Sequence, residues 1–316
     1  MVRKINFIAR IDPFKGDGGG EVVLRSLLNH GLDNDYIESI NICTPETTNY
    51  YDPDADFTII ADIYNFPRSP IRFTESFLNM AMNANHPYFV FQNGYADICG
   101  LDYFPCSGYE EDMEKCSHRH QDCLFEKLTV QRLFAGAKTS YFVSPQHEEV
   151  MKCFVDPKRS FVVRPIINTQ MFFNANLPRE IPYLYVGTIC EAKGVFNILK
   201  WAEENKIDPV DIAFVGTNIS GVDLKLMGFQ YSPKLPYEDL PNVYNRTDTF
   251  IHFPRWPEPQ GRTVVEAALC GCNLLVNDNV GATSFSFDLS KPENIDGAEQ
   301  EFWDDINQQT GYQHDS

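Results

Sequence analysis

Short apolar runs rich in β-branched and aromatic residues alternate with amphipathic segments along the chain. The runs have the length of buried strands, and the segments between them repeat apolar residues at helical intervals. This alternation predicts an α/β fold with parallel sheets and crossover helices. The predicted strands are 3–10, 36–43, 57–63, 87–93, 139–144 and 160–165, then 183–189, 211–216, 248–254 and 273–278. The predicted helices are 20–31, 72–84, 124–137 and 145–154, then 194–205, 237–247, 261–271 and 297–311.

The pattern also predicts where the chain divides. Residues 167–182 contain two prolines and show little periodicity, which predicts a linker. We therefore expect an N-terminal Rossmann-like domain over 1–166 and a C-terminal one over 183–296, followed by an acidic helix and tail over 297–316. The first predicted helix should end at Gly31, because glycine is favoured just after the last turn of a helix.

Composition and charge make some binding partners of the protein less plausible than others. The 316 residues are enough for two domains, and Lys and Arg number 26 against 44 for Asp and Glu, a net charge of −18. Such a field disfavours nucleic acid and anionic lipid as partners. No apolar run approaches the ~18 residues that span a membrane, and the first run resembles a strand more than a signal peptide. Nine cysteines, an odd number, and no export signal predict a reducing, cytoplasmic compartment.

The most informative stretch is residues 250–278. Glu258 and Glu266 are separated by seven residues, and a helix is predicted to begin at Gly261 and Arg262 between them. The free N–H groups and positive dipole end of such a helix suit a phosphate, and the carboxylates suit sugar hydroxyls. A proline-rich turn followed by an amphipathic helix with an Arg262–Glu266 surface pair explains the same spacing.

A second motif follows the first strand of the C-terminal half. That strand ends at Gly187, a loop follows, and Lys193 and Gly194 precede a helix. A lysine in front of a helix N-terminus at the carboxyl end of a strand suits a diphosphate. The alternative is an ordinary surface lysine.

A third motif is the glycine run at 18–20, which follows the first strand and precedes a helix. Glycines let the backbone approach a ligand closely, and the helix directs its N-terminus toward it. A flexible turn accounts for the run as well.

Together these motifs resemble glycosyltransferase family 4, whose members are retaining transferases with the GT-B fold. That family has a glycine, a short loop and a Lys-Gly pair after the first C-terminal strand, here Gly187, Lys193 and Gly194. Residues 235–271 resemble its Pro-Tyr, Leu-x-x-x-Tyr, strand, Glu-x7-Glu, helix and Cys-Gly signature. The resemblance is specific over 183–282, and it implies two Rossmann-like domains that face each other across a cleft.

The resemblance also implies roles for single residues. Lys193, Glu258 and Arg262 would be the catalytic residues: Lys193 contacts the donor diphosphate, Arg262 adds a second cation, and Glu258 holds hydroxyls of the donor sugar. Glu266 would bind the ribose, and the Pro-Tyr pair would line the base. The donor-binding residues so implied are Gly19, Gly20, Asn93, Gly187, Thr188, Pro236, Tyr237, Gln260, Gly261, Thr263 and Glu266.

Two positions depart from the family pattern. Thr188 stands where the family often has an arginine after the glycine, so either Arg255 or Arg262 replaces that charge or activity is impaired. Asn93 stands where the family often has a histidine near the sugar.

Cysteines and histidines also gather between residues 99 and 123, where some family members carry a cysteine-rich insertion. A structural zinc site and free or paired thiols are both open, because no Cys-x-x-Cys pair is present. The cluster consists of Cys99, Cys106, Cys116 and Cys123 with His118 and His120. The remaining cysteines are expected to pack in cores: Cys43, Cys153, Cys190, Cys270 and Cys272.

The expected activity is transfer of a sugar, with retention, from a UDP-, GDP- or ADP-linked donor to a hydroxyl acceptor. The resemblance implies that no cofactor is required and that no metal takes part, and no Asp-x-Asp stands on a plausible donor loop. Two alternatives stay open. One is a non-catalytic sugar-nucleotide-binding protein, which Thr188 and Asn93 favour. The other is a Rossmann oxidoreductase, whose Gly-x-Gly-x-x-Gly spacing residues 17–22 fit poorly.

Overall fold

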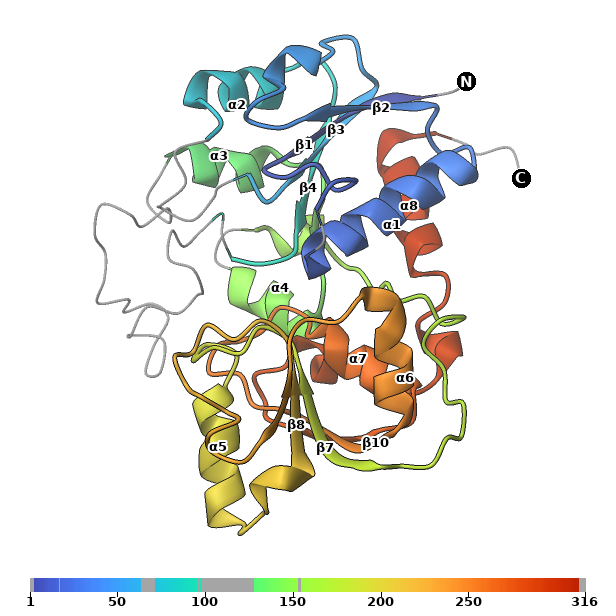
Figure 1. Cartoon of the computed structure of the whole chain (residues 1–316). Helices are drawn as coiled ribbons and strands as arrows, with labels where there is room; N and C mark the ends of the chain where they lie inside the picture. The colour runs from blue at the N-terminus through green and yellow to red at the C-terminus, as the bar shows by residue number, and fades with distance from the viewer. Residues whose placement is uncertain are drawn as a thin grey trace. The chain divides into compact units, whose positions relative to one another are not determined.

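The computed structural model describes residues 3–16, 18–63, 72–95, 97, 128–152 and 155–312. The chain forms two compact α/β units (Figure 1). Unit 1 comprises Met1–Ile166 together with Gly297–Ser316, and unit 2 comprises Ile167–Asp296. Each unit is built on one parallel sheet, as the alternation of strand and helix patterns predicts.

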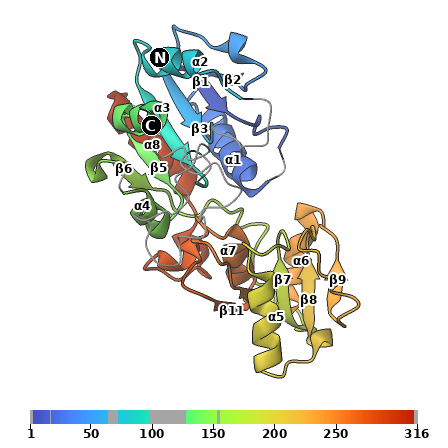
Figure 2. The ribbon, with the colours of Figure 1, turned by 90° about the vertical axis from the view of Figure 1, so that its left-hand side faces the viewer.

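In the described part of unit 1, six parallel strands form the sheet in the order β2-β1-β3-β4-β5-β6 (Figure 2). The strands are β1 (Lys4–Ala9), β2 (Ser39–Cys43), β3 (Phe57–Ala61), β4 (Tyr88–Gln92), β5 (Ser140–Phe142) and β6 (Ser160–Val162). The helices are α1 (Gly19–Asp33), α2 (Glu75–Met82), α3 (Leu128–Gly136), α4 (Pro145–Met151) and α8 (Ala298–Thr310). The strand order reverses direction at β1, so the carboxyl ends of β1 and β3 flank a topological switch point.

Helix α8 returns from unit 2 and packs beside α1 on one face of this sheet (Figure 1). Trp303 is fully buried there and donates from its indole N–H to the carbonyl oxygen of Leu27 at 2.8 Å. The apolar side chains of α8 join the core of unit 1, so this terminal helix belongs to the N-terminal unit rather than forming a separate tail.

The expectation that α1 ends at Gly31 is wrong, because the helix runs on to Asp33. Gly31 is a buried helical residue, and a β-carbon placed on it would lie 2.4 Å from Cζ2 of Trp303. A glycine is needed here to make room for the indole ring of α8, not to end the helix.

Unit 2 is described throughout, and its five parallel strands have the order β11-β10-β7-β8-β9. The strands are β7 (Ile181–Val186), β8 (Ile212–Val215), β9 (Gln230–Ser232), β10 (Thr247–His252) and β11 (Asn273–Val276). The helices are α5 (Val195–Glu204), α6 (Leu240–Asn245) and α7 (Arg262–Leu269). Successive residues of β7 point to opposite faces of the sheet and pack in two separate cores. Leu184 packs with α6 and α7, and Tyr185 packs with α5.

The chain of unit 2 runs from β7 outward to β9 and then crosses back to β10 and β11. The switch point therefore lies between the carboxyl ends of β7 and β10, which are adjacent and parallel. Ligands of open parallel sheets bind in the crevice outside the carboxyl ends at such a point. The loops that follow β7 and β10 are thus the ones to search for function.

Three further features bear on the sequence expectations. Residues 167–182, expected to be a linker, lie in unit 2, where Ile167 and Phe172 are buried in the core and β7 begins at Ile181.

Strand β9 was not predicted, because three residues at the edge of a sheet leave no periodicity to detect. Among the described residues, no helix is both long and apolar enough to cross a bilayer.

The cysteines that the structure describes agree with the expectation of core packing. All four are free thiols with buried side chains: Cys43, Cys190, Cys270 and Cys272. Burial raises the pKa of the Cys43 thiol to about 11, which keeps it protonated and unreactive at neutral pH. Cys153 lies outside the described residues.

Candidate functional site

Lys193 and Glu258 meet at the switch point of unit 2. Lys193 comes from the loop after β7 and Glu258 from the loop after β10. The ammonium of Lys193 lies 2.5 Å from Oε1 of Glu258, and it also lies 5.0 Å from the centre of the Trp256 ring. Lys193 and Glu258, which are 65 positions apart in the sequence, therefore form an ion pair in the structure.

Two backbone contacts bring these loops together. The amide of Arg255 donates to the carbonyl oxygen of Ala192 at 2.9 Å. Gly194 has a φ of +84° and is packed against the carbonyl oxygen of Phe253, which also accepts a hydrogen bond from the Asn197 side chain at 2.9 Å. The turn that carries Lys193 is thus fixed on the segment that leads to Glu258.

Glu258 is held along its backbone as well as at its carboxylate. Its amide donates to the carbonyl oxygen of Asn279 at 2.7 Å, and its own carbonyl oxygen accepts from the amide of Gly281 at 2.9 Å. Its Oε2 is hydrogen-bonded to Nε2 of the buried His252 at the end of β10. Burial alone would raise the pKa of Glu258, but the Lys193 ammonium and the His252 ring hold it well below its usual range. Glu258 is therefore a buried carboxylate, only 8 % exposed, that stays ionised.

A second group forms around Glu266 on α7. Both its oxygens accept hydrogen bonds: Oε1 from the hydroxyl of Tyr237 at 3.0 Å and Oε2 from that of Tyr244 at 3.2 Å. Arg262, one helical turn earlier, donates to the Tyr237 hydroxyl at 2.6 Å and lies 3.3 Å from Oε1 of Glu266. Burial raises the pKa of Tyr237, and the Glu266 charge raises it further, so the phenol stays protonated. Arg262 and Glu266 are therefore largely buried partners and not a surface pair.

The segment between the two glutamates leads into helix α7. Gly261 is its N-terminal capping residue, with a φ of +78°, and a β-carbon there would lie 2.9 Å from Val280. Gln260 is buried, and its carbonyl oxygen accepts from the amide of Ala282 at 2.6 Å, whereas Thr263 is half-buried on the first turn. The positive end of α7 thus lies between Glu258 and Glu266.

The remaining residues predicted in unit 2 have less specific contacts. Gly187 directly follows β7, and a β-carbon on Gly216 would lie 1.8 Å from the carbonyl oxygen of Gly187. Thr188 accepts a hydrogen bond from the Tyr185 hydroxyl through its carbonyl oxygen at 2.8 Å. Pro236 is exposed beside Tyr237.

Arg255, one of two candidates to replace an arginine at position 188, is exposed and pairs with Glu191 at the surface. Arg262 is the more buried of the two candidates and lies in the Glu266 group.

In unit 1 the predicted residues gather at the carboxyl ends of β1, β3 and β4. Gly20 lies in the first turn of α1, directly after Gly19, and a β-carbon on it would lie 3.3 Å from Nδ2 of Asn93. Asn93 in turn donates to Oδ2 of Asp62 at 3.1 Å. Burial and the nearby Asp97 carboxylate raise the pKa of Asp62 to about 7, against hydrogen bonds from Asn93 that lower it. The contact of Gly20 with Asn93 thus brings together the glycine run at 18–20 and the Asn93 position, which are far apart in the sequence.

The structure adds residues that the motifs did not identify. His252 was missed because a single histidine at the end of an apolar strand usually packs in a core, although its place six residues before Glu258 was a usable signal. Asp62 was missed although an aspartate directly after a buried strand often lies at a ligand-binding edge. Tyr244 belongs to the expected Leu-x-x-x-Tyr signature, but its bond to Glu266 needed the structure.

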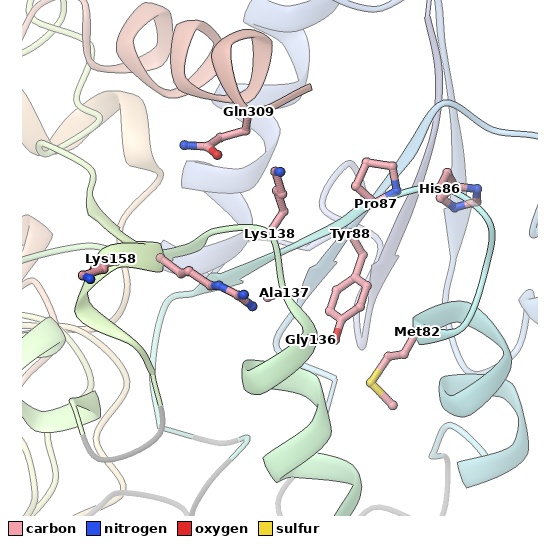
Figure 3. A pocket seen from close by; sticks show the side chains of 10 residues that line it. Met82, His86, Pro87, Tyr88, Gly136, Ala137, Lys138, Lys158 and Gln309 are labelled. Carbon is pink, nitrogen blue, oxygen red and sulfur yellow. The ribbon is translucent and has the colours of Figure 1, made fainter. Parts of the chain in front are cut away.

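Unit 1 also contains a cavity of about 360 Å³ at the amino ends of its strands, whereas the Asn93 group lies at the carboxyl ends (Figure 3). It lies near the amino ends of β4 and β5, with Lys138 and Gln309 on one side of it and Tyr88 and Met82 on the other (Figure 3). No predicted site residue lines it. It is therefore separate from the group around Asn93.

The cysteine cluster for which a structural zinc site and free or paired thiols were both open, Cys99, Cys106, Cys116 and Cys123, lies outside the described residues. Within the part of the chain that is described, no three His, Cys, Asp or Glu side chains gather as metal ligands would.

Residues 167–285 match the family described as glycosyl transferases group 1, a range that contains Lys193, Glu258, Arg262 and Glu266. No curated protein sequence matches the chain.

Several solved structures resemble it over nearly the whole length. Anabaena HepE in complex with UDP and glucose is 13% identical, with a TM-score of 0.57 over 98% of this chain and 95% of that one. Sucrose-phosphate synthase from Thermosynechococcus elongatus is 14% identical, with a TM-score of 0.55 over 98% and 97%. The catalytic domain of Arabidopsis thaliana starch synthase IV is 10% identical, with a TM-score of 0.55 over 98% and 94%. Residues 167–285 thus match the glycosyl transferases group 1 family, and the chain has the two-unit α/β architecture of the GT-B fold.

Proposed function

We propose that this protein is a glycosyltransferase that moves a sugar from a nucleotide-diphosphate-sugar to a hydroxyl acceptor, with retention and without a metal ion. The observation that carries the proposal is the Lys193–Glu258 ion pair at the switch point of unit 2. A cation beside a buried carboxylate at that place provides for the two parts of such a donor, the diphosphate and the sugar hydroxyls. The family match over 167–285 supports the same activity.

The difficult step is departure of the nucleoside diphosphate while positive charge develops on the sugar ring. Lys193, Arg262 and the N-terminus of α7 would stabilise the negative charge that grows on the leaving phosphate. Such preorganised charges are worth most in a site that excludes water, and Arg262 is only 10 % exposed along its side chain. In retaining transfer the acceptor hydroxyl would pass its proton to the leaving phosphate.

The two glutamates would orient the donor. Glu258, which stays ionised, would accept hydrogen bonds from hydroxyls of the sugar. Glu266 would accept from the ribose, with Tyr237 and Pro236 beside the base. Gly19, Gly20 and Asn93 of unit 1 are proposed to contact substrate, with the acceptor bound mainly by that unit.

The ligands of similar structures suggest which nucleotides to test first. HepE was solved with UDP-glucose, and the starch synthase domain with ADP and acarbose. UDP- and ADP-sugars are therefore the first donors to test, followed by GDP-sugars. A hexosyl group is the sugar class that we propose.

The test combines binding with turnover. We expect one class of nucleotide sugar to raise the melting temperature, and Glu258→Ala to lower donor hydrolysis or transfer at least about 100-fold. Glu203→Ala, at an exposed position on α5 of the same unit, is the matched control. The anomeric configuration of the product tests retention, and unchanged turnover in EDTA tests metal independence.

Other outcomes would assign a different function. Binding without turnover in the wild type and in Glu258→Ala would indicate a non-catalytic sugar-nucleotide-binding protein. Stabilisation by a nicotinamide dinucleotide alone would indicate an oxidoreductase. Binding of none of these ligands would contradict the proposal.

A further inference from the structure

His252 is the last residue of β10, and its side chain is buried at the base of the Glu258 loop. The side chain is 2 % exposed, and its Nε2 forms a hydrogen bond with Oε2 of Glu258. The two carboxylate oxygens are thus divided between two partners, Oε1 to Lys193 and Oε2 to His252. None of the motif roles assigned above uses this histidine.

Packing fixes the ring in this orientation. Its centre lies 5.6 Å from that of Tyr185 on the neighbouring strand β7, with an angle of 30° between the planes. It also lies 6.4 Å from the centre of the Phe250 ring two residues earlier. Because Tyr185 itself is fully buried, the imidazole has little room to rotate away from Glu258.

The hydrogen bonds indicate which nitrogen carries the proton. Among the described residues, Nδ1 of His252 has no hydrogen-bond partner. A proton on that buried nitrogen would lack an acceptor, which costs about 1–3 kcal/mol. A proton on Nε2 is accepted by Glu258, so the ring donates to the carboxylate.

The two partners of Glu258 differ in what else they can do. The Lys193 side chain is 20 % exposed and carries three N–H donors, so it can turn to a phosphate. His252 is enclosed and has its one donor on Glu258. A carboxylate held by the lysine alone would lose its orientation when the lysine engages a diphosphate.

We propose that His252 is a positioning residue that holds Glu258 in place for the donor sugar while Lys193 is shared with the diphosphate. This inference rests on the proposed function. It predicts that loss of the His252 donor weakens recognition of the sugar part of the donor, and not of the nucleotide part.

Two substitutions separate this role from simple packing. His252→Phe keeps an aromatic ring next to Tyr185 but removes the donor, and His252→Gln retains an N–H that can reach Glu258. We expect His252→Phe to lower kcat/KM for the nucleotide sugar about 10- to 100-fold, with the Kd of the nucleoside diphosphate changed less than about twofold, because sugar contacts alone are lost. His252→Gln should recover most of that loss. His86→Phe removes a histidine hydrogen bond to Thr58 in unit 1 and is the matched control.

A spectroscopic measurement checks the tautomer without any turnover. In protein labelled with ¹⁵N, the His252 ring should carry its proton on Nε2, and the signal of that proton should shift in Glu258→Gln. This measurement also serves if His252→Phe fails to fold, together with the kinetics of His252→Gln.

The outcomes distinguish this inference from the proposed function. Equal turnover in His252→Phe and the wild type, equal losses in His252→Phe and His252→Gln, or a proton on Nδ1 would overturn the positioning role. Those results would leave the proposed function intact if Glu258→Ala still abolishes transfer. A protein that binds no nucleotide sugar at all, with the expected Nε2 proton, would instead remove the proposed function.

Discussion

Gly194 lies so close to Phe253 that a β-carbon on the glycine would be 1.8 Å from the carbonyl oxygen of Phe253. The glycine also has a φ of +84°, a conformation that other residues rarely adopt. We predict that Gly194→Ala lowers the free energy of unfolding by about 3 kcal/mol or more, because it adds a backbone clash to the cost of the left-handed conformation. Urea unfolding followed by circular dichroism measures this loss.

Gly221→Ala is the matched control for that substitution. Gly221 has a similar φ of +78°, but a β-carbon on it would meet no atom within 4 Å. Its replacement should therefore cost only the conformational strain, about 1–2 kcal/mol. Equal losses in the two variants would show that the contact with Phe253 does not shape the loop of Lys193.

Turnover should depend on the charge of Lys193. Lys193→Ala removes the cation assigned to the diphosphate, and we expect kcat to fall at least about tenfold, as loss of charge stabilisation usually causes. Lys200→Ala, on the exposed face of the next helix, removes an equal charge and should leave kcat unchanged. Steady-state kinetics with the donor found by thermal shift provide the measurement. Unchanged kinetics in Lys193→Ala would remove this residue from the site.

The lowered pKa of Glu258 makes stability depend on pH in a defined direction. Lys193 and His252 favour the carboxylate in the folded protein, so its charge stabilises the fold above the unfolded pKa of about 4.3. That contribution is lost as the pH falls below this value, by up to about 1.4 kcal/mol per pH unit. The difference in unfolding free energy between wild type and Glu258→Gln should therefore be constant above pH ~6 and shrink below pH ~4.

Urea unfolding from pH 3 to 7 measures that difference, with Glu238→Gln as the control for removal of one exposed carboxylate. A difference that grows on acidification would mean that burial raises the pKa of Glu258 and that its partners do not compensate. In the Lys193→Met background the change with pH should be smaller, because one of the two partners is gone.

The sequence was informative where function and fold use a fixed local spacing. The position of Glu258 and Glu266 on either side of a helix start could be predicted from the spacing between them, and that of Lys193 before a helix because Gly194 and a helical pattern follow it. The strands other than β9 were predictable from their apolar runs, and their order places the Lys193 and Glu258 loops at one switch point. That Lys193 contacts Glu258 itself required the structure, since 65 positions separate the two residues.

Contacts between distant segments were beyond the reach of pattern analysis. Asp62 meets Asn93 across 31 positions, and only the parallel pairing of β3 with β4 makes them neighbours. The return of α8 to unit 1 depends on side chains such as Trp303, whose periodicity shows a buried face but not the surface that buries it. The same limit caused the error at Gly31.

Gly31 and Trp303 provide a test of how α8 is held. Replacing glycine by alanine inside a helix normally stabilises a protein by about 0.5–1 kcal/mol. We predict the opposite for Gly31→Ala, a loss of about 1–3 kcal/mol, because the new β-carbon would lie 2.4 Å from the indole ring. Trp303→Leu should itself cost about 3 kcal/mol through a cavity and the lost bond to Leu27. In that background Gly31→Ala should become neutral or stabilising, a coupling of about 1–3 kcal/mol in a double-mutant cycle. Additive effects of the two substitutions would mean that α8 is anchored to unit 1 by its other contacts, such as those of Phe302, and not by the fit between this glycine and this tryptophan.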